Sequence, residues 1–166
     1  LPSLRITHAL HQGTAELGIV SDAVDTSGLD TRPFRDDPLV LIMPNDHPLA
    51  DVRAPSFNQT LAYEYVGLNA HNALAIYLEE QALHSGQRMS MRIRAEGFDG
   101  VMRMVAHGAG LAIVPQAAVQ RFAAGQGWKC CALEEPWAQR KLLLCARSFE
   151  ALPRYAGALL EALSAD

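Results

Sequence analysis

The sequence predicts an α/β fold, in which helices cover a sheet that contains parallel strands. The stretch 98–119 provides the first observation. Apolar residues recur there at helical spacing from Val101 to Val105, and Gly108 can end that helix. A short apolar strand, Leu111–Val114, follows, and a second helical pattern begins after Pro115. A helix, a glycine turn, a buried strand and another helix together form a unit of a parallel α/β sheet.

Two further patterns support this fold class. Leu39–Met43 is apolar at every position, which is typical of a strand buried on both faces. Apolar residues at helical spacing near the C-terminus predict a last helix that packs on a sheet. They are Leu152, Tyr155, Ala156, Leu159, Leu160 and Leu163. With 166 residues, 49% of them hydrophobic, the chain can bury a core as one large domain or two small lobes.

The first part of the chain predicts one helix followed by strands. Leu4–Gln12 has a helical pattern that Gly13 ends. Glu16–Val20 is a short apolar strand, and Leu29–Phe34 is expected to be extended. Pro44–Pro48 cannot continue the strand before it, because it holds two prolines with Asn and Asp. We therefore expect a turn or a crossover there, and a first candidate hinge.

The rest of the chain predicts helices and strands in alternation. The expected elements are a helix from Ser56 to Leu61, a strand over Tyr65–Leu68, a helix ending near His84, and strands over Met89–Ala95, Trp128–Leu133 and Arg140–Ala146. Apolar and polar residues alternate in Met89–Ala95, which predicts a half-exposed strand. Arg140–Ala146 is the candidate for the return crossing between lobes.

Charge and composition narrow the function classes. The net charge is −4, from 14 Lys and Arg against 18 Asp and Glu, and no basic stripe is visible. A chain that itself bound nucleic acid would usually show a basic stripe or patch. No apolar run approaches the roughly 18 residues of a membrane span, and no export leader precedes the first helix. We expect a cytoplasmic protein whose cysteines, Cys130, Cys131 and Cys145, are reduced.

Three segments carry a family resemblance. Leu10–Val20 looks like the pattern L-x-x-G-x-x-(D/E)-L-(A/G)-I, and Pro38–Ala50 looks like P-L-V-L-V-x-P-x-x-H-P-L-A, with Ile42 at the fifth position. Val105–Pro115 resembles V-x-x-G-x-G-(I/L)-(A/G)-x-(L/V)-P. In this order and at this spacing they resemble the effector-binding domain of LysR-type transcriptional regulators. The resemblance covers most of the chain.

This resemblance implies a two-lobed α/β fold of the type II periplasmic-binding-protein kind. Lobe I would comprise 1–45 and 146–166, and lobe II 46–145. The family's domain normally opens with a strand and a helix before the segment that matches Leu10–Val20, so the N-terminal part is expected to be incomplete. The winged helix-turn-helix that binds DNA is expected to lie outside this chain.

The implied function is to bind a small organic, anionic effector between the lobes. Binding would alter how a homodimer or homotetramer presents its separate DNA-binding domains. The alternative is an exported solute-binding protein of the same fold, which a leader peptide on the native gene would support. The third class is an enzyme that uses a His or Cys in the cleft. The sequence contains neither a Gly-x-Ser-x-Gly elbow nor a Gly-Lys-Ser phosphate loop. We expect no enzyme activity, no cofactor and no metal.

Helix N-termini that face a ligand crevice favour an anionic group. One predicted N-terminus follows Leu68 and offers Asn69, His71 and Asn72. In the resemblance, Asn69 occupies a position where the family commonly has an effector-binding Thr or Ser; Asn is equally a plain N-cap. His71 is either a switchable cation or an exposed first-turn residue.

The second predicted N-terminus offers Phe98, Asp99, Gly100 and Val101. Phe98 either packs on an apolar ligand body or is a core aromatic. Asp99 is expected to be the N-cap, and its carboxylate would repel an acid. We therefore expect the Asn69 end to contribute more to anion recognition than the Asp99 end.

Ser21 and Asp22 follow the strand Glu16–Val20 and are candidates to line the crevice, because ligands bind at the carboxyl ends of strands in such sheets. Ser21 resembles the family's Thr or Ser at that strand end. The alternative is a turn in which both side chains bond local amides.

Overall fold

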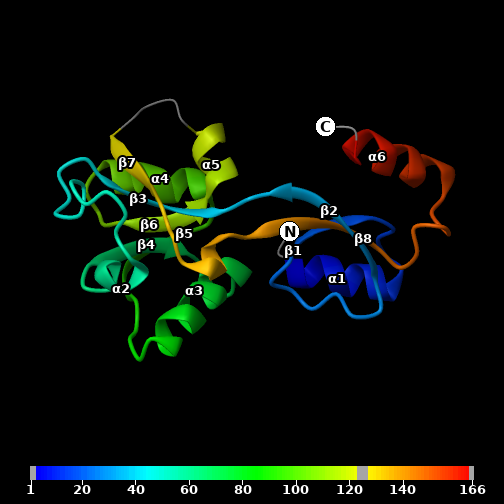
Figure 1. The fold of residues 1–166 in the computed structure, drawn as a ribbon, viewed down its shortest axis with the longest axis horizontal. Coiled ribbons are helices and arrows are strands. Elements are labelled where there is room, and N and C mark those ends of the chain that lie inside the picture. The colour runs from blue at the N-terminus through cyan, green and yellow to red at the C-terminus, as the bar shows by residue number, and fades with distance from the viewer. Residues whose placement is uncertain (1–2, 123–126, 165–166) are drawn as a thin grey trace. The chain divides into compact units, whose positions relative to one another are not determined.

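A computed structural model describes residues 3–122 and 127–164. The chain forms two compact units (Figure 1). Unit 1 comprises Leu1–Asp37 and Arg140–Asp166, and unit 2 comprises Pro38–Gln139. Both crossings between the units therefore come earlier than the predicted boundaries after residues 45 and 145.

Strand pairing explains this difference. Strand β3 (Leu39–Pro44) pairs with β6 (Ala112–Pro115) and β7 (Trp128–Ala132), so it belongs to unit 2. Strand β8 (Lys141–Ala146) pairs with β1 (Gly18–Ser21), so it belongs to unit 1.

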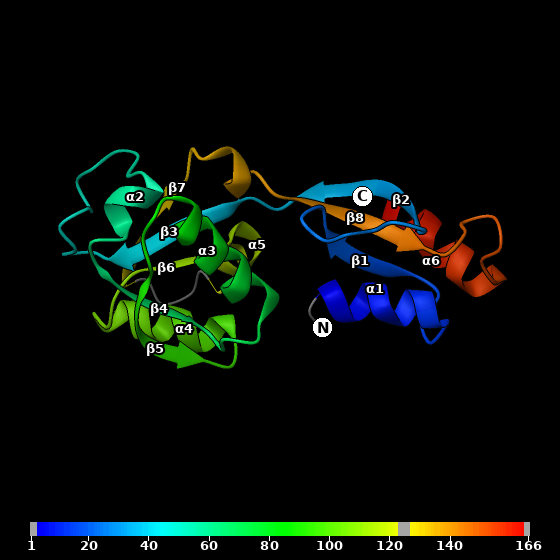
Figure 2. The ribbon, with the colours of Figure 1, turned by 90° about the horizontal axis from the view of Figure 1, so that it is seen from below.

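In unit 1, β8 lies between β1 and β2 (Asp30–Asp36), and both pairings are antiparallel. Helix α1 (Ser3–Gln12) packs along β1 (Figure 2). A glycine allows this approach, because a Cβ on Gly18 would lie 2.4 Å from a methyl group of Ile6. Helix α6 (Arg154–Ser164) ends the unit. The core centres on Leu10, Val20 and Cys145.

Unit 2 holds two sheets. The first has the order β6-β3-β7 and is antiparallel. The second pairs β4 (Glu64–Leu68) with β5 (Ser90–Ala95) in parallel, and a parallel bridge from Tyr65 to Leu111 links it to the start of β6. The helices are α2 (Phe57–Thr60), α3 (Ala73–His84), α4 (Phe98–Ala106), α5 (Gln116–Arg121) and the 3₁₀ turn η1 (Pro136–Ala138).

The pattern of β3 is confirmed, because all its residues are buried. Leu39, Leu41 and Met43 join one hydrophobic cluster, and Val40 and Ile42 join another. The two faces of the strand thus meet two separate cores, which leaves no position for a polar residue.

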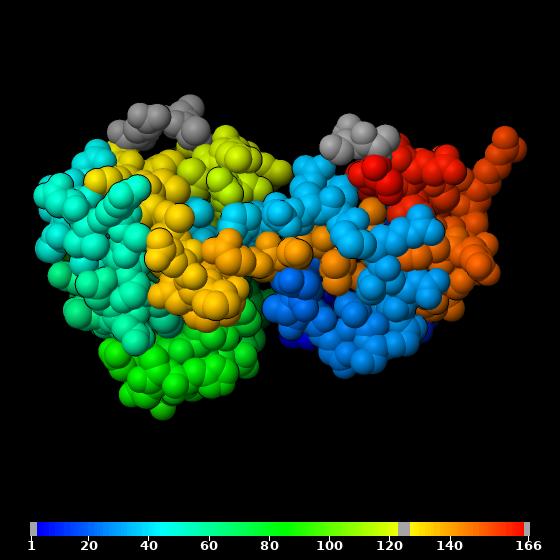
Figure 3. Space-filling view, viewed as in Figure 1, coloured from blue at the N-terminus to red at the C-terminus, as the bar shows by residue number. Residues whose placement is uncertain are grey.

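Two other expectations are confirmed only in part. The Pro44–Pro48 segment is the expected turn, closed by a bond from the His47 N–H to the Pro44 carbonyl at 3.0 Å, but it lies within unit 2 and is neither a crossing nor the hinge. The chain that follows it, cyan in Figure 3, lies on the surface of that unit. The 98–119 unit has the predicted helix, turn and strand. Leu111, just before β6, forms a parallel bridge with Tyr65 of β4, whereas β6 is antiparallel to its other neighbour β3.

No helix within 3–122 and 127–164 is long and apolar enough to cross a membrane.

Candidate ligand-binding site

The candidate site lies where the two parallel strands of unit 2 end. Leu68 of β4 is paired with Ala95 of β5, and each is the last residue of its strand. Asn69 and Glu96 therefore leave the sheet side by side, and the Asn69 Nδ2 donates to the Glu96 Oε1 at 2.7 Å. The carboxyl ends of parallel strands are where α/β proteins commonly bind ligands.

The turn between β4 and α3 is fixed by Asn72, which is the N-cap of α3. The Asn72 side chain accepts the Leu74 N–H at 2.9 Å, and its own N–H donates to the Asn69 carbonyl at 2.9 Å. Asn69 is thus one turn too early to cap the helix, and its side chain is directed to Glu96 instead. His71 is exposed in the same turn.

Arg94 supplies a positive charge at this edge of the sheet. Its Nη1 donates to the Leu68 carbonyl at 2.9 Å, and its Nη2 lies 3.8 Å from the Glu79 Oε1. Sequence reasoning missed both Arg94 and Glu96 as site residues. The alternation of Met89–Ala95 did indicate that Arg94 is exposed, but only the register of β4 with β5 shows which residues adjoin Asn69.

The start of α4 differs from the prediction. Gly97 is the N-cap and makes no side-chain hydrogen bond, so the expected capping by Asp99 is wrong. Asp99 lies in the first turn instead. It is exposed, and its Oδ1 would be 2.9 Å from a Cβ placed on Gly97.

The apolar residues of this turn are mainly core residues. Phe98 is half-buried and packs against both hydrophobic clusters of unit 2, which favours the alternative of a core aromatic. Val101 is only 1% exposed, so its side chain is not available to a ligand. Gly100 is half-buried against Ala95, where an added Cβ would lie 3.2 Å from the Ala95 Cβ.

Ser21 and Asp22 lie in unit 1, at the end of β1. Ser21 is 7% exposed, and its Oγ accepts the Ala23 N–H at 3.3 Å. The Asp22 N–H donates to the Lys141 carbonyl at 2.9 Å, and its side chain is exposed. These contacts describe the local turn that was the alternative for Ser21. Because β1 is antiparallel to β8, the argument from parallel strand ends does not apply here.

The described part of the chain offers little support for a metal site or a reactive cysteine. It holds no group of three or more His, Cys, Asp or Glu side chains that could bind a metal. Cys130, Cys131 and Cys145 are free thiols. Burial raises the pKa of the Cys145 thiol, which makes it a weaker nucleophile near neutral pH.

Comparison with known proteins decides the family. A model described as the LysR substrate binding domain matches residues 1–166. The chain belongs to this family. Among curated relatives, a probable RuBisCO transcriptional regulator of Cyanidioschyzon merolae is 25% identical over 70% of this chain and 41% of its own length. The HTH-type transcriptional regulator CysL of Bacillus subtilis is 22% identical over 64% of this chain and 36% of its own length.

Solved structures show the same fold. The regulatory domain of Synechocystis CcmR in complex with 2-PG superposes with a TM-score of 0.86 at 19% identity, over 99% of this chain and 79% of that one. The effector-binding domain of QuiR in complex with shikimate gives 0.80 at 17% identity, over 99% and 77%. The predicted two-lobed, periplasmic-binding-protein-like α/β fold is confirmed.

This LysR substrate-binding domain spans 41% and 36% of the length of the two curated relatives named above. Both relatives are named as transcriptional regulators, the first as a probable one.

Proposed function

We propose that this chain is the effector-sensing part of a LysR-type transcriptional regulator, and that a small organic molecule binds at the ends of β4 and β5. The observation that carries the proposal is the pairing of Leu68 with Ala95, which brings Asn69 and Glu96 together beside the start of α3. The helix α4 begins two residues after Glu96. Polar side chains and two helix N-termini thus converge at one edge of unit 2.

The proposed ligand is an organic acid. The backbone N–H groups at the start of α4 support this choice, because Gly97 offers no side chain to cap them. The α3 terminus is already capped by Asn72. We therefore place the acidic group nearer α4 than the sequence suggested, with Asp99 as the charge that limits its affinity. CcmR and QuiR, the structural neighbours, were solved with 2-PG and shikimate.

The regulatory step follows from binding equilibria. In the whole protein, which would be a homodimer or homotetramer, the ligand alters DNA binding by a separate helix-turn-helix domain. It can do so only by binding one arrangement of the protein more tightly than another. The exported solute-binding protein is not favoured, because the family match and the curated relatives point to transcriptional regulation.

Asn69→Ala tests the site. A library of small carboxylic acids is first screened by thermal shift, and each compound that binds is then measured by calorimetry. Loss of the amide should weaken binding by about 1–3 kcal/mol, since a polar group of the ligand loses its partner. Asn58→Ala is the matched control, because Asn58 is an exposed residue of α2. Wild-type affinity in Asn69→Ala would place the ligand elsewhere.

A further inference from the structure

We propose that Glu96 is a specificity-determining residue of this site and selects a ligand that carries a hydroxyl or ammonium group as well as its acid. The inference rests on the proposed function and adds to it a defined chemical group at a defined position. It concerns the point where Asn69 and Glu96 meet.

The geometry at this point is fixed from both strands. Leu68 and Ala95 are register partners, so the two side chains start from adjacent backbone positions. The Leu68 carbonyl is held by the Arg94 guanidinium at 2.9 Å, and the Asn69 carbonyl is held by the Asn72 N–H at 2.9 Å. The Asn69–Glu96 pair therefore stands on backbone that is anchored on both sides of Asn69.

Glu96 determines which group Asn69 presents to a ligand. An ionised carboxylate only accepts hydrogen bonds, so it takes the Nδ2 of Asn69, at 2.7 Å. The Asn69 Oδ1 is then the part of the amide that is left for a ligand, together with the second oxygen of Glu96. Both groups are acceptors, and the pair lies at the protein surface.

The charges around the pair favour the same chemistry. Arg94 is the nearby cation, but its guanidinium is already shared between the Leu68 carbonyl and Glu79. A ligand carboxylate or phosphate placed at the pair would be repelled, whereas a hydroxyl or an ammonium could donate to it. The acid of the ligand would then lie at the uncapped start of α4.

The test compares compounds that share a skeleton and differ in one substituent. One trio is succinate, malate and aspartate, and another is propionate, lactate and alanine; within each, hydrogen, hydroxyl and ammonium replace one another. Binding to the wild-type chain is measured by calorimetry. We expect a donor-bearing member to bind about tenfold or more tightly than the member without one, the order of a hydrogen bond to a charged acceptor.

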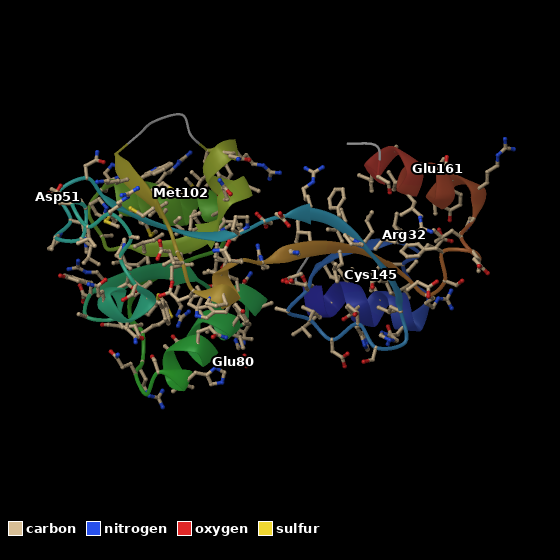
Figure 4. The ribbon with its side chains drawn as sticks, in the orientation of Figure 1. Arg32, Asp51, Glu80, Met102, Cys145 and Glu161 are labelled. Atoms are coloured by element: carbon tan, nitrogen blue, oxygen red, sulfur yellow. The ribbon has the colours of Figure 1, made fainter. Side chains whose placement is uncertain are left out.

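Glu96→Gln is the informative variant. A neutral amide should abolish a preference for ammonium and reduce a preference for hydroxyl, which separates the two ligand types. Glu80→Gln is the matched control, because it removes the same charge from an exposed residue of α3. Glu80 is labelled in Figure 4. It should leave every preference unchanged. A melting curve confirms that both variants are folded.

The outcomes separate this inference from the proposed function. If the member without a donor binds as tightly as its partners, or if Glu96→Gln keeps the wild-type preference, the role of Glu96 is wrong while the ligand site stands. If Asn69→Ala also leaves every affinity unchanged, or if no carboxylic acid in the library binds the wild-type chain, the proposed site fails with it.

Discussion

His47 shows how one side chain couples the turn after β3 to pH. Its Nδ1 accepts the Leu49 N–H at 3.1 Å, and its ring packs in a T-shaped arrangement with the Tyr63 ring, with centroids 4.6 Å apart. Burial lowers the pKa of His47, and Asp46 opposes this shift. The neutral ring is the form that the fold requires, because a protonated Nδ1 could not accept the Leu49 N–H.

The pKa of His47 is lower in the folded chain than in the unfolded one, so the unfolded chain binds the proton more readily. Its contribution to the free energy of unfolding is complete above about pH 6.5 and is lost as the pH falls through the folded pKa. Urea unfolding measured between about pH 7 and pH 5 should show this loss. His47→Gln should flatten the slope, and His84→Gln, at an exposed helix end, should not. Equal slopes in all three proteins would contradict the assignment.

At the scale of elements, the junction between α4 and β6 depends on Gly110. Gly110 has φ +155 and lies against the first residue of β4, where a Cβ on Gly110 would be 2.5 Å from the Glu64 carbonyl oxygen. Gly108, two residues earlier, has φ +80 and no neighbour within 4 Å of an added Cβ. Both glycines therefore have a positive φ, and only Gly110 adds a close steric approach to it.

Gly110→Ala should lower the free energy of unfolding by about 3 kcal/mol, because backbone must move to admit the methyl group. Gly108→Ala should cost about 1 kcal/mol, the usual cost of a left-handed conformation for a residue with a Cβ. Chemical denaturation of both variants checks the difference. If the two losses are equal, the close approach to Glu64 does not limit this junction.

Elements could be predicted from the sequence where one local pattern determines them. The unbroken apolar run of β3 indicates burial on both faces whatever its neighbours are, and the structure confirms this. The partner of a strand is not local information. No local pattern in the sequence indicates that Ala95 pairs with Leu68, so the hydrogen bond between Asn69 and Glu96 could not be predicted. The prediction of the α4 N-cap was wrong for a related reason, since Gly and Asp are both acceptable N-cap residues and the structure uses Gly97 instead of Asp99.

At the scale of the whole molecule, each crossing lies between two consecutive strands that pair in sheets of different units. The chain leaves unit 1 after Asp37 and returns to it at Arg140. The sequence placed these points later, because Pro44–Pro48 is the most obvious break in the pattern. Prolines mark where a strand must end, whereas a unit boundary depends on which sheet the next strand joins.

Asp37 and Arg140, the unit 1 residues at these two crossings, are bonded to each other. The Arg140 Nη2 lies 2.7 Å from the Asp37 Oδ2, and the Asp37 N–H donates to the Arg140 carbonyl at 3.0 Å. The Arg140 side chain is only 14% exposed and the Asp37 side chain only 9%. The exposed pair of Arg92 with Glu64, at 3.3 Å and 53% exposure for both side chains, provides a comparison within the same chain.

Arg140→Gln should lower the free energy of unfolding by about 3 kcal/mol, because the Asp37 carboxylate stays buried and loses its guanidinium. Arg92→Gln should cost less than about 1 kcal/mol, since solvent screens that pair. Urea denaturation of both variants measures the difference, and added salt should affect the Arg140 pair less than the Arg92 pair. Replacing Asp37 and Arg140 together by leucine should restore part of the lost stability, because no buried charge then remains at either position. A double variant as unstable as Arg140→Gln would mean that the crossings require the hydrogen bonds of this pair and not only its neutrality.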